Sequence, residues 1–218
     1  MNIKEEKQST NEIIYINYFD NITDQSVQHV MRVLTNIVSQ VKGLKEICFM
    51  FSSNGGSVSA GITLYYFLKA LPLKITMHNI GHIDSIATVV FLSGEKRIAA
   101  KGSRFIFHGV KSFSGGPTSR SLSELKEIKD GLEKDQNRIS KIYAEETDLD
   151  AKEVQEMFNV GESKEPHFAK SKGIISDVLD PSIPPGCQII YLDGQQQIQQ
   201  QTGRQIVFPR GPIGKNKK

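Results

Sequence analysis

Hydrophobic and polar residues follow two alternating patterns along the first half of the chain. Short runs of β-branched and aromatic residues are typical of strands, and they occur at 13–16, 47–51, 74–78 and 103–108. Between these runs, apolar residues recur at steps of three and four, the period of a helix, over 24–41, 57–71 and 85–92. The repeated order of strand, helix and strand predicts right-handed crossovers and an α/β sheet covered by helices.

The second half of the chain has a different pattern. Residues 111–120 are rich in glycine, serine and proline, which predicts a loop. Residues 121–147 predict a long charged helix with a thin apolar stripe, and such a helix usually packs against a partner. A short helix that begins at Asp150 and a last strand within 174–179 complete the pattern.

These patterns divide the chain into three parts. A short polar segment at 1–12 precedes one α/β domain at 13–180. A glutamine-rich extension at 181–218 follows it, and within this extension we expect a short strand at 189–192.

The composition is that of an ordinary globular protein. The 218 residues are 38% hydrophobic, which suffices for one domain with a core and is too apolar for a disordered chain. The 27 basic and 24 acidic residues nearly balance, so charge does not support nucleic-acid binding. No signal peptide is visible, the longest apolar stretch (86–92) is far too short to span a membrane, and two cysteines make no metal or disulfide pattern. We therefore expect a cytoplasmic protein that binds neither nucleic acid nor membrane.

A glycine turn follows the second predicted strand. Gly55 and Gly56 lie between that strand and a helix, at the edge where α/β sheets place their ligands. Two glycines let the backbone turn sharply and expose its amides. The sequence has neither the Gly-Lys-Ser/Thr of a phosphate loop nor a Gly-x-Gly-x-x-Gly. By itself the turn is most simply a strand-to-helix connection.

Ser85 and His108 follow the next two strands of this series. Ser85 stands at the predicted start of a helix, where a serine is most often an N-cap and where free amides face outward. His108 ends a strand before a glycine-rich loop, and it is either a packed residue or a general base. His78 and His82 are four residues apart with Asp84 nearby, a spacing that would suit two metal ligands on a helix, but the glycine between the histidines argues against a helix there. We expect no metal and no cofactor.

Together these features favour nucleophilic acyl chemistry. That chemistry needs a serine hydroxyl, an imidazole to take its proton, and backbone amides to hold the developing oxyanion. Ser85, His108 and the amides of Gly56 and Ile86 supply these parts at the ends of neighbouring elements.

Three ordered motifs resemble the proteolytic subunit of the Clp protease, a serine peptidase of the ClpP/crotonase fold. Residues 52–61 (SSNGGSVSAG) are similar to that family's Asn-Ser-Pro-Gly-Gly-Ser-Val-x-Ala-Gly block, and residues 81–86 (GHIDSI) to its Gly-x-Ala-Ala-Ser-Met block. Residues 103–108 (SRFIFH) are similar to its Ser-Arg-x-Met-Ile-His. Gly56 and Ser85 are 29 positions apart, which matches the family without a gap.

The resemblance implies a fold and a role for each matched position. Ser85 would be the nucleophile, His108 its base, and the amides of Gly56 and Ile86 the oxyanion hole. The fold would be a repeated β-β-α superhelix with a protruding handle helix at about 121–147. In the family this helix interleaves two rings into a barrel with an enclosed chamber. The implied partners are peptides or unfolded proteins as substrates and further copies of the chain in rings.

The sequence also departs from the family pattern. The family's third triad residue is an aspartate, and its position falls on Gly161. Glu162 is the first candidate to orient His108 in its place, Asn159 is the second, and the remaining alternative is that no third residue exists. Asp84 replaces an alanine next to the nucleophile, where an inward-pointing carboxylate would oppose an oxyanion.

Three further departures concern other regions. Asn54 replaces a proline before the glycine pair. About a dozen residues precede the first strand, where the family carries a longer segment that meets an ATPase unfoldase, so docking of such a partner is in question. The extension at 181–218 has no assigned counterpart in the family.

The leading hypothesis is a serine endopeptidase that cleaves peptides or unfolded proteins inside an oligomeric chamber, through an acyl-enzyme at Ser85. A catalytically inactive structural subunit that partners an active paralogue is the alternative, since the family aspartate is missing. Retention of both Ser85 and His108 argues against it. An enzyme of the crotonase type that acts on coenzyme A thioesters is disfavoured, because that chemistry relies on glutamates near its oxyanion hole.

Overall fold

The computed structural model describes residues 12–111 and 119–192. The strands in these ranges are β1 (Ile13–Phe19), β2 (Glu46–Ser53), β3 (Lys74–Asp84), β4 (Lys96–Ala99), β5 (Arg104–Ile106), β6 (Ser163–Lys164), β7 (Asp177–Val178) and β8 (Gln188–Leu192). The helices are α1 (Asp24–Gln40), α2 (Val58–Lys69), α3 (Ala87–Phe91), α4 (Leu122–Glu146), α5 (Ala151–Val160) and α6 (Pro166–Ser171). None of the helices within these ranges has the length and apolarity that crossing a membrane requires.

The strands form one mixed sheet in the order β6-β5-β3-β2-β1-β8, with β4 on β3 and β7 on β4. β1, β2 and β3 pair in parallel, and the α/β fold predicted from the sequence is confirmed. One edge of β3 serves two partners, because residues 76–79 pair with β4 and residues 82–84 pair with β5. As a result, β5 pairs with the last three residues of β3 and lies next to Ser85, which follows them.

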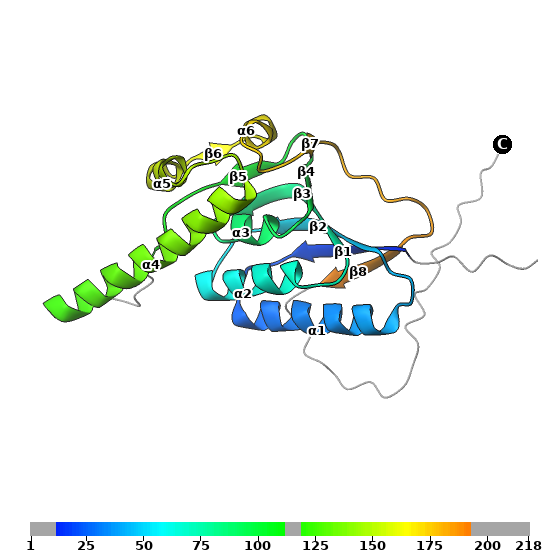
Figure 1. Cartoon of the computed structure of the whole chain (residues 1–218), viewed down its shortest axis with the longest axis horizontal. Coiled ribbons are helices and arrows are strands. Elements are labelled where there is room, and N and C mark those ends of the chain that lie inside the picture. The colour runs from blue at the N-terminus through cyan, green and yellow to red at the C-terminus, as the bar shows by residue number, and fades with distance from the viewer. Residues whose placement is uncertain (1–11, 112–118, 193–218) are drawn as a thin grey trace, which may run out of the picture.

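Helices α1, α2 and α3 cover one face of the central strands (Figure 1). α1 begins at Thr23 with a capping box, and its buried apolar residues recur at the helical period predicted from the sequence. β2 is buried along almost its whole length, as expected of a strand covered on both faces. The core lies between the sheet and these three helices, and it continues into buried residues at the end of α4 and in α5 and α6.

Helix α4 projects away from this body, as Figure 1 shows. Ser121 caps it with a second capping box, which confirms the helix predicted over 121–147. Its buried residues all lie near its C-terminal end, between Ile139 and Tyr143. At the other end Leu122 is 85% exposed and Leu125 is 51% exposed, so most of the helix makes no contact with the core.

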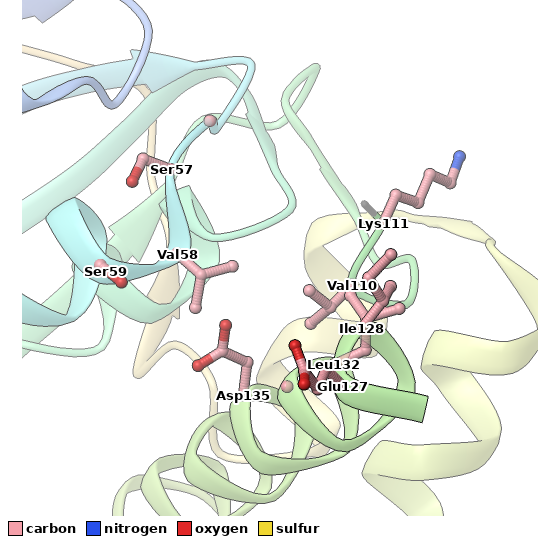
Figure 2. A pocket seen from close by; sticks show the side chains of 11 residues that line it. Ser57, Val58, Ser59, Val110, Lys111, Glu127, Ile128, Leu132 and Asp135 are labelled. Carbon is pink, nitrogen blue, oxygen red and sulfur yellow. The ribbon is translucent and has the colours of Figure 1, made fainter. Parts of the chain in front are cut away.

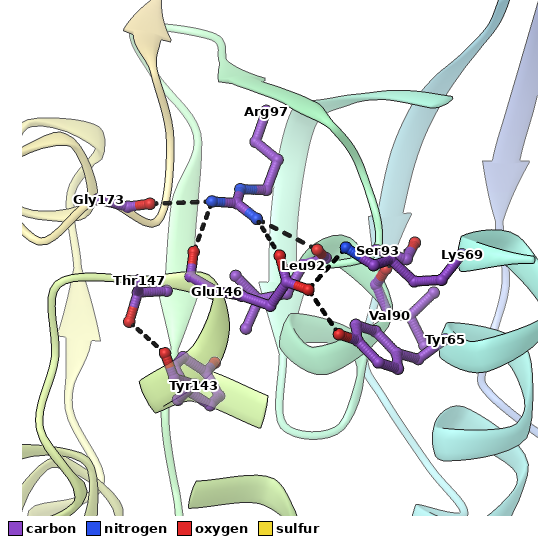
Figure 3. Close-up of polar contacts among 10 residues, drawn as sticks. All are labelled: Tyr65, Lys69, Val90, Leu92, Ser93, Arg97, Tyr143, Glu146, Thr147 and Gly173. Atoms are coloured by element: carbon purple, nitrogen blue, oxygen red, sulfur yellow. Dashed lines mark hydrogen bonds and ion pairs between the residues drawn. The ribbon is translucent and has the colours of Figure 1, made fainter. Parts of the chain in front are cut away.

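Arg97 of β4 fastens the base of α4 to the body (Figure 3). Its Nη2 donates to the carbonyl of Glu146 at 2.7 Å and to the carbonyl of Gly173 at 3.1 Å. Its Nη1 donates to the Glu146 carboxylate at 3.3 Å and to the carbonyl that ends α3 at 3.2 Å. Burial opposes ionisation of Glu146, but hydrogen bonds from Lys69 and Tyr65 and the charges of Lys69 and Arg97 hold its pKa below the ordinary value.

The structure corrects several sequence predictions. β3 continues through Gly81 to Asp84, whereas the strand was predicted to end at residue 78 with a turn at this glycine. β4, β6 and α6 were not predicted, and β7 is shorter than the strand expected within 174–179. The strand predicted at 189–192 is confirmed as β8, one residue longer, and it pairs in parallel with β1. Most of the segment at 1–12, most of the predicted loop and the glutamine-rich stretch lie outside the described residues.

Candidate active site

The glycine turn after β2 has a conformation that only glycine adopts without strain. Gly55 has φ +81° and Gly56 has φ +148°. A Cβ atom on Gly56 would lie 2.2 Å from the carbonyl oxygen of Ile22, and one on Gly55 would lie 2.8 Å from the Cβ of Ser85. Hydrogen bonds of 2.8 Å from Ile22 N to Gly55 O and from Ser57 N to Ile22 O hold the turn in place. The turn is therefore pressed against the residue that follows β3.

Ser85 occupies a strained turn between β3 and α3. Its φ is +55°, and no other described residue except glycine has a positive φ. For a residue with a side chain this left-handed conformation costs about 1–2 kcal/mol. Ser85 N donates to Ile106 O at 3.0 Å, and the carbonyl of Ser85 accepts from Thr88 N at 3.0 Å and from Thr88 Oγ1 at 2.6 Å.

The interpretation of Ser85 as an N-cap is wrong. The capping position of α3 belongs to Ile86, and no side chain caps the helix. The hydroxyl of Ser85 is therefore not engaged by the helix that follows it. Strain of this kind is concentrated at functional sites, where it holds a side chain in a position that the chain would otherwise avoid.

Two residues next to Ser85 have backbone amides without a hydrogen-bond acceptor in the described part of the chain. Within the described part of the chain, neither Gly56 N nor Ile86 N donates a hydrogen bond to a protein acceptor. Gly56 and Ile86 line a cavity of about 50 Å³ together with Ser85 and His108. The structure thus brings together the four residues that the sequence selected, and the two amides remain available to an oxyanion.

His108 lies beside Ser85 without contacting its hydroxyl. Both residues line the small cavity and a second one of about 460 Å³ on the side of α1, but no hydrogen bond joins them among the described residues. His108 Nδ1 lies 2.9 Å from the carbonyl oxygen of Gly109. Because a carbonyl can only accept, this contact requires a hydrogen on Nδ1. In the neutral ring, Nε2 is then left free to accept a proton.

The structure does not bring Glu162 to His108. The carboxylate of Glu162 pairs with Lys164, and Glu162 lines a different cavity, between α5 and α6. Only its backbone reaches this region, where its carbonyl accepts from Phe107 N at 3.0 Å. Gly161, at the position of the family aspartate, is the left-handed C-cap of α5. Asn159 is exposed on the same helix.

A groove of about 520 Å³ runs beside α4 (Figure 2). It is lined by the start of α2, by Val110 and Lys111 after β5, and by residues of α4 between Glu127 and Asp135. Val58 and Val110 line both this groove and the small cavity, so the two spaces adjoin. Asp135 projects toward Val58, and Glu127 lies further along α4.

The sequence pattern indicated the apolar stripe of α4 but not that this helix forms a wall of the site. Two residues of the stripe, Ile128 and Leu132, line the groove. The surface that this stripe faces could not be predicted, because it belongs in part to an element some 70 residues earlier in the chain.

The histidines considered and rejected as metal ligands have other partners. His78 is buried, and its Nε2 lies 2.8 Å from the carbonyl of Leu179. His82 Nε2 lies 2.9 Å from Asn54 Oδ1. Both residues lie on β3 at positions of the same parity, so a strand, not a helix, separates them.

The chain is similar in sequence and in fold to known proteins. The model that describes the Clp protease family matches residues 5–182. The ATP-dependent Clp protease proteolytic subunit of Oltmannsiellopsis viridis is 26% identical over 160 residues, which cover 72% of this chain and 80% of the relative. The subunit of the same description from Chlorella vulgaris is 28% identical over 145 residues, 66% of this chain and 69% of the relative. A solved structure of a ClpP1 mutant from Listeria monocytogenes superposes with a TM-score of 0.65 at 19% identity, covering 78% of this chain and 92% of that one.

Proposed function

Because the chain belongs to the Clp protease family, we propose that it is a serine endopeptidase with Ser85 as nucleophile and His108 as base. The observation that supports the proposal is the strained conformation of Ser85, a residue that lines one small cavity together with His108, Gly56 and Ile86. A serine that served only the fold would have no need of this conformation.

The chemistry follows from the groups present. His108 Nε2 takes the proton of Ser85 Oγ while the oxygen bonds to the carbonyl carbon of the substrate. The amides of Gly56 and Ile86 hold the oxyanion, and the peptide C–N bond breaks as the imidazolium returns its proton to the leaving amine. Water then hydrolyses the acyl-enzyme by the same route, and the serine is restored.

The cavities suggest how a chain would lie. An extended segment would occupy the groove along α4, and the side chain before the scissile bond would enter the small cavity. That cavity is lined mainly by apolar residues, which are Val58, Ile86, Val110, Ile139 and Phe158. We therefore expect cleavage after small or medium apolar residues.

We also propose that the active form is a ring assembly. The family forms oligomeric rings, and the exposed leucines of α4 are suited to contact other copies of the chain. Ser85 and His108 are adjacent without a hydrogen bond, and catalytic hydrogen bonds in apo sites often form only on substrate binding. Contacts of α4 within the assembly would act on the same site, because α4 forms one wall of the groove. An ATPase unfoldase remains a candidate partner of such a ring.

The test is covalent labelling of the purified chain with a fluorophosphonate probe. We expect one adduct, located at Ser85 by peptide mass, and loss of the adduct in Ser85→Ala and His108→Ala. Ser39→Ala is the matched control, because Ser39 is an exposed serine on α1 whose hydroxyl bonds only to a carbonyl of its own helix. Hydrolysis of an unfolded protein by the same preparation should follow the labelling.

The competing function is an inactive structural subunit. It is favoured by the absence of an orienting residue at Gly161 and by the missing contact between Ser85 and His108. A folded, assembled protein that takes up no probe at Ser85 would establish this alternative and refute the peptidase.

A further inference from the structure

Asp84 is placed where it can act on His108. It is the last residue of β3, directly before Ser85, and its register partner on β5 is Ile106. Side chains of register partners point to the same face of a sheet. His108 follows Ile106 by two residues, just beyond the end of β5, and it lines the same small cavity as Ser85, the neighbour of Asp84.

The carboxyl group of Asp84 lacks the partners that a buried acid normally has. Its Oδ1 is buried and has no hydrogen-bond partner within residues 12–111 and 119–192. Burial raises the pKa of Asp84, while the nearby charges of His82, Arg104 and His108 oppose that rise. Leaving such a group unpaired costs free energy, and the family carries an alanine at this position.

Only one of the neighbouring groups changes charge in the proposed reaction. His82 is engaged through both ring nitrogens, with Ser52 and Asn54, and Arg104 is an exposed, permanently charged side chain. On β6, the residue in register with Ile106 is Ser163, which does not ionise, and the charges of Glu162 and Lys164 neutralise each other. His108 is therefore the group on which a charge at Asp84 has a mechanistic effect.

We propose that Asp84 is a positioning residue whose carboxylate stabilises the protonated form of His108 through space, in place of the aspartate that the chain lacks at Gly161. The inference rests on the proposed function. Two groups would then share the two tasks of a triad carboxylate, which are to fix the tautomer of the histidine and to stabilise its positive charge. The carbonyl of Gly109 keeps the hydrogen on Nδ1, and Asp84 supplies the negative charge when Nε2 accepts the proton of Ser85.

Asp84 is also placed so that it does not oppose the oxyanion. It is absent from the linings of the small cavity, the groove and the cavity beside α1. The carboxylate therefore does not line the cavity that Ser85 shares with Gly56 and Ile86, whose amides are the proposed oxyanion hole.

The first experiment compares Asp84→Asn with the wild type in peptide hydrolysis. We expect kcat to fall about tenfold, the effect of one pKa unit of lost charge stabilisation, with KM unchanged because Asp84 touches no substrate. The acid limb of the pH profile should move to lower pH, since the base is protonated less readily without the carboxylate. Asp84→Glu should restore part of kcat. Glu95→Gln removes one negative charge from an exposed site and should change none of these.

The second experiment is independent of activity. The imidazole resonances of His108 are titrated by NMR in the wild type, in Asp84→Asn and in Asp84→Ala, which restores the residue of the family and keeps the test open if one variant fails to fold. We expect the midpoint to fall by about one pH unit in both variants. An unchanged midpoint would overturn the inference, whether or not the wild type is active. A shifted midpoint in a protein that takes up no fluorophosphonate would refute the peptidase and leave the action of Asp84 on His108 standing.

Discussion

Replacement of Gly56 by alanine tests the geometry of the site most directly. The new methyl group would lie 2.2 Å from the carbonyl oxygen of Ile22, well inside contact distance, and that oxygen belongs to the backbone and cannot rotate away. The turn must therefore move, and the amide of Gly56 moves with it. One substitution thus perturbs both the fold and the proposed oxyanion hole.

The two effects have separate magnitudes. Displacing the turn weakens the two hydrogen bonds that join Ile22 to Gly55 and Ser57, each 2.8 Å long and each contributing about 1 kcal/mol. An alanine with φ near +148° adds strain of about 1–3 kcal/mol. We expect a loss of about 3–5 kcal/mol in the free energy of unfolding, which lowers the Tm by roughly 10 °C in a chain of this size. Removal of one oxyanion donor lowers kcat by about 10²–10³.

The assay separates these effects by measuring Tm and the rate of fluorophosphonate labelling at a temperature where both proteins are folded. Gly102→Ala is the control, because no atom lies within 4 Å of its Cβ position and its φ is not positive. It should leave both quantities almost unchanged. A Gly56→Ala variant with a Tm within 2 °C of the wild type and a labelling rate within about threefold of the wild-type rate would show that the turn does not fix the position of the Gly56 amide.

Four further predictions concern α4 and Asp84. Arg97→Ala should cost about 2–4 kcal/mol in urea unfolding, because its four hydrogen bonds to Leu92, Glu146 and Gly173 contribute about 1 kcal/mol each, and Arg97→Lys should recover only part of this loss. The pKa of Glu146 is held below its ordinary 4.5, so its contribution to stability is complete above that pH and is lost as the pH falls through the lowered pKa. The Tm difference between the wild type and Glu146→Gln should therefore shrink in acid, and an equal difference at all pH values would contradict the assignment. Asp84 has a raised pKa, which means that its ionised form destabilises the fold. Asp84→Ala should raise the Tm at neutral pH, with no gain below the ordinary pKa of 3.8. Leu125→Asp should reduce the assembled fraction in native mass measurements without lowering the Tm of the isolated chain, since Leu125 is exposed.

The sequence was sufficient to predict elements whose ends depend on local interactions. The side chains of Thr23 and Ser121 cap α1 and α4, and the predicted helices over 24–41 and 121–147 start within one residue of the observed ones. β4 and β6 were missed because strands of four and two residues owe their existence to pairing with distant partners. β3 continues through Gly81 for the same reason: its register against β2 shifts there, and its last residues pair with β5.

The same distinction applies to the site. Ser85, His108, Gly56 and Ile86 could be selected because each stands at the end of an element, and parallel strands bring such ends together. The strained φ of Ser85 could not be predicted, because no local pattern marks it and the glycine turn that lies against Ser85 is 30 residues earlier in the chain. Glu162 was chosen by its place in the chain alone. Its carboxylate instead pairs with a lysine only two positions away, a contact that sequence position could not exclude.

In the proposed ring of serine peptidase subunits, helix α4 would link assembly to catalysis by its geometry. At 1.5 Å per residue its 25 residues extend about 37 Å, and only the last turns are held, by the core and by Arg97. The residues that line the groove, from Glu127 to Asp135, lie between this anchor and the exposed leucines. Any contact made by those leucines therefore acts on the groove through a rigid helix. A site that forms its final hydrogen bond only in the assembled ring would keep single copies of the chain inactive, and the missing contact between Ser85 and His108 in the isolated chain is what such coupling requires.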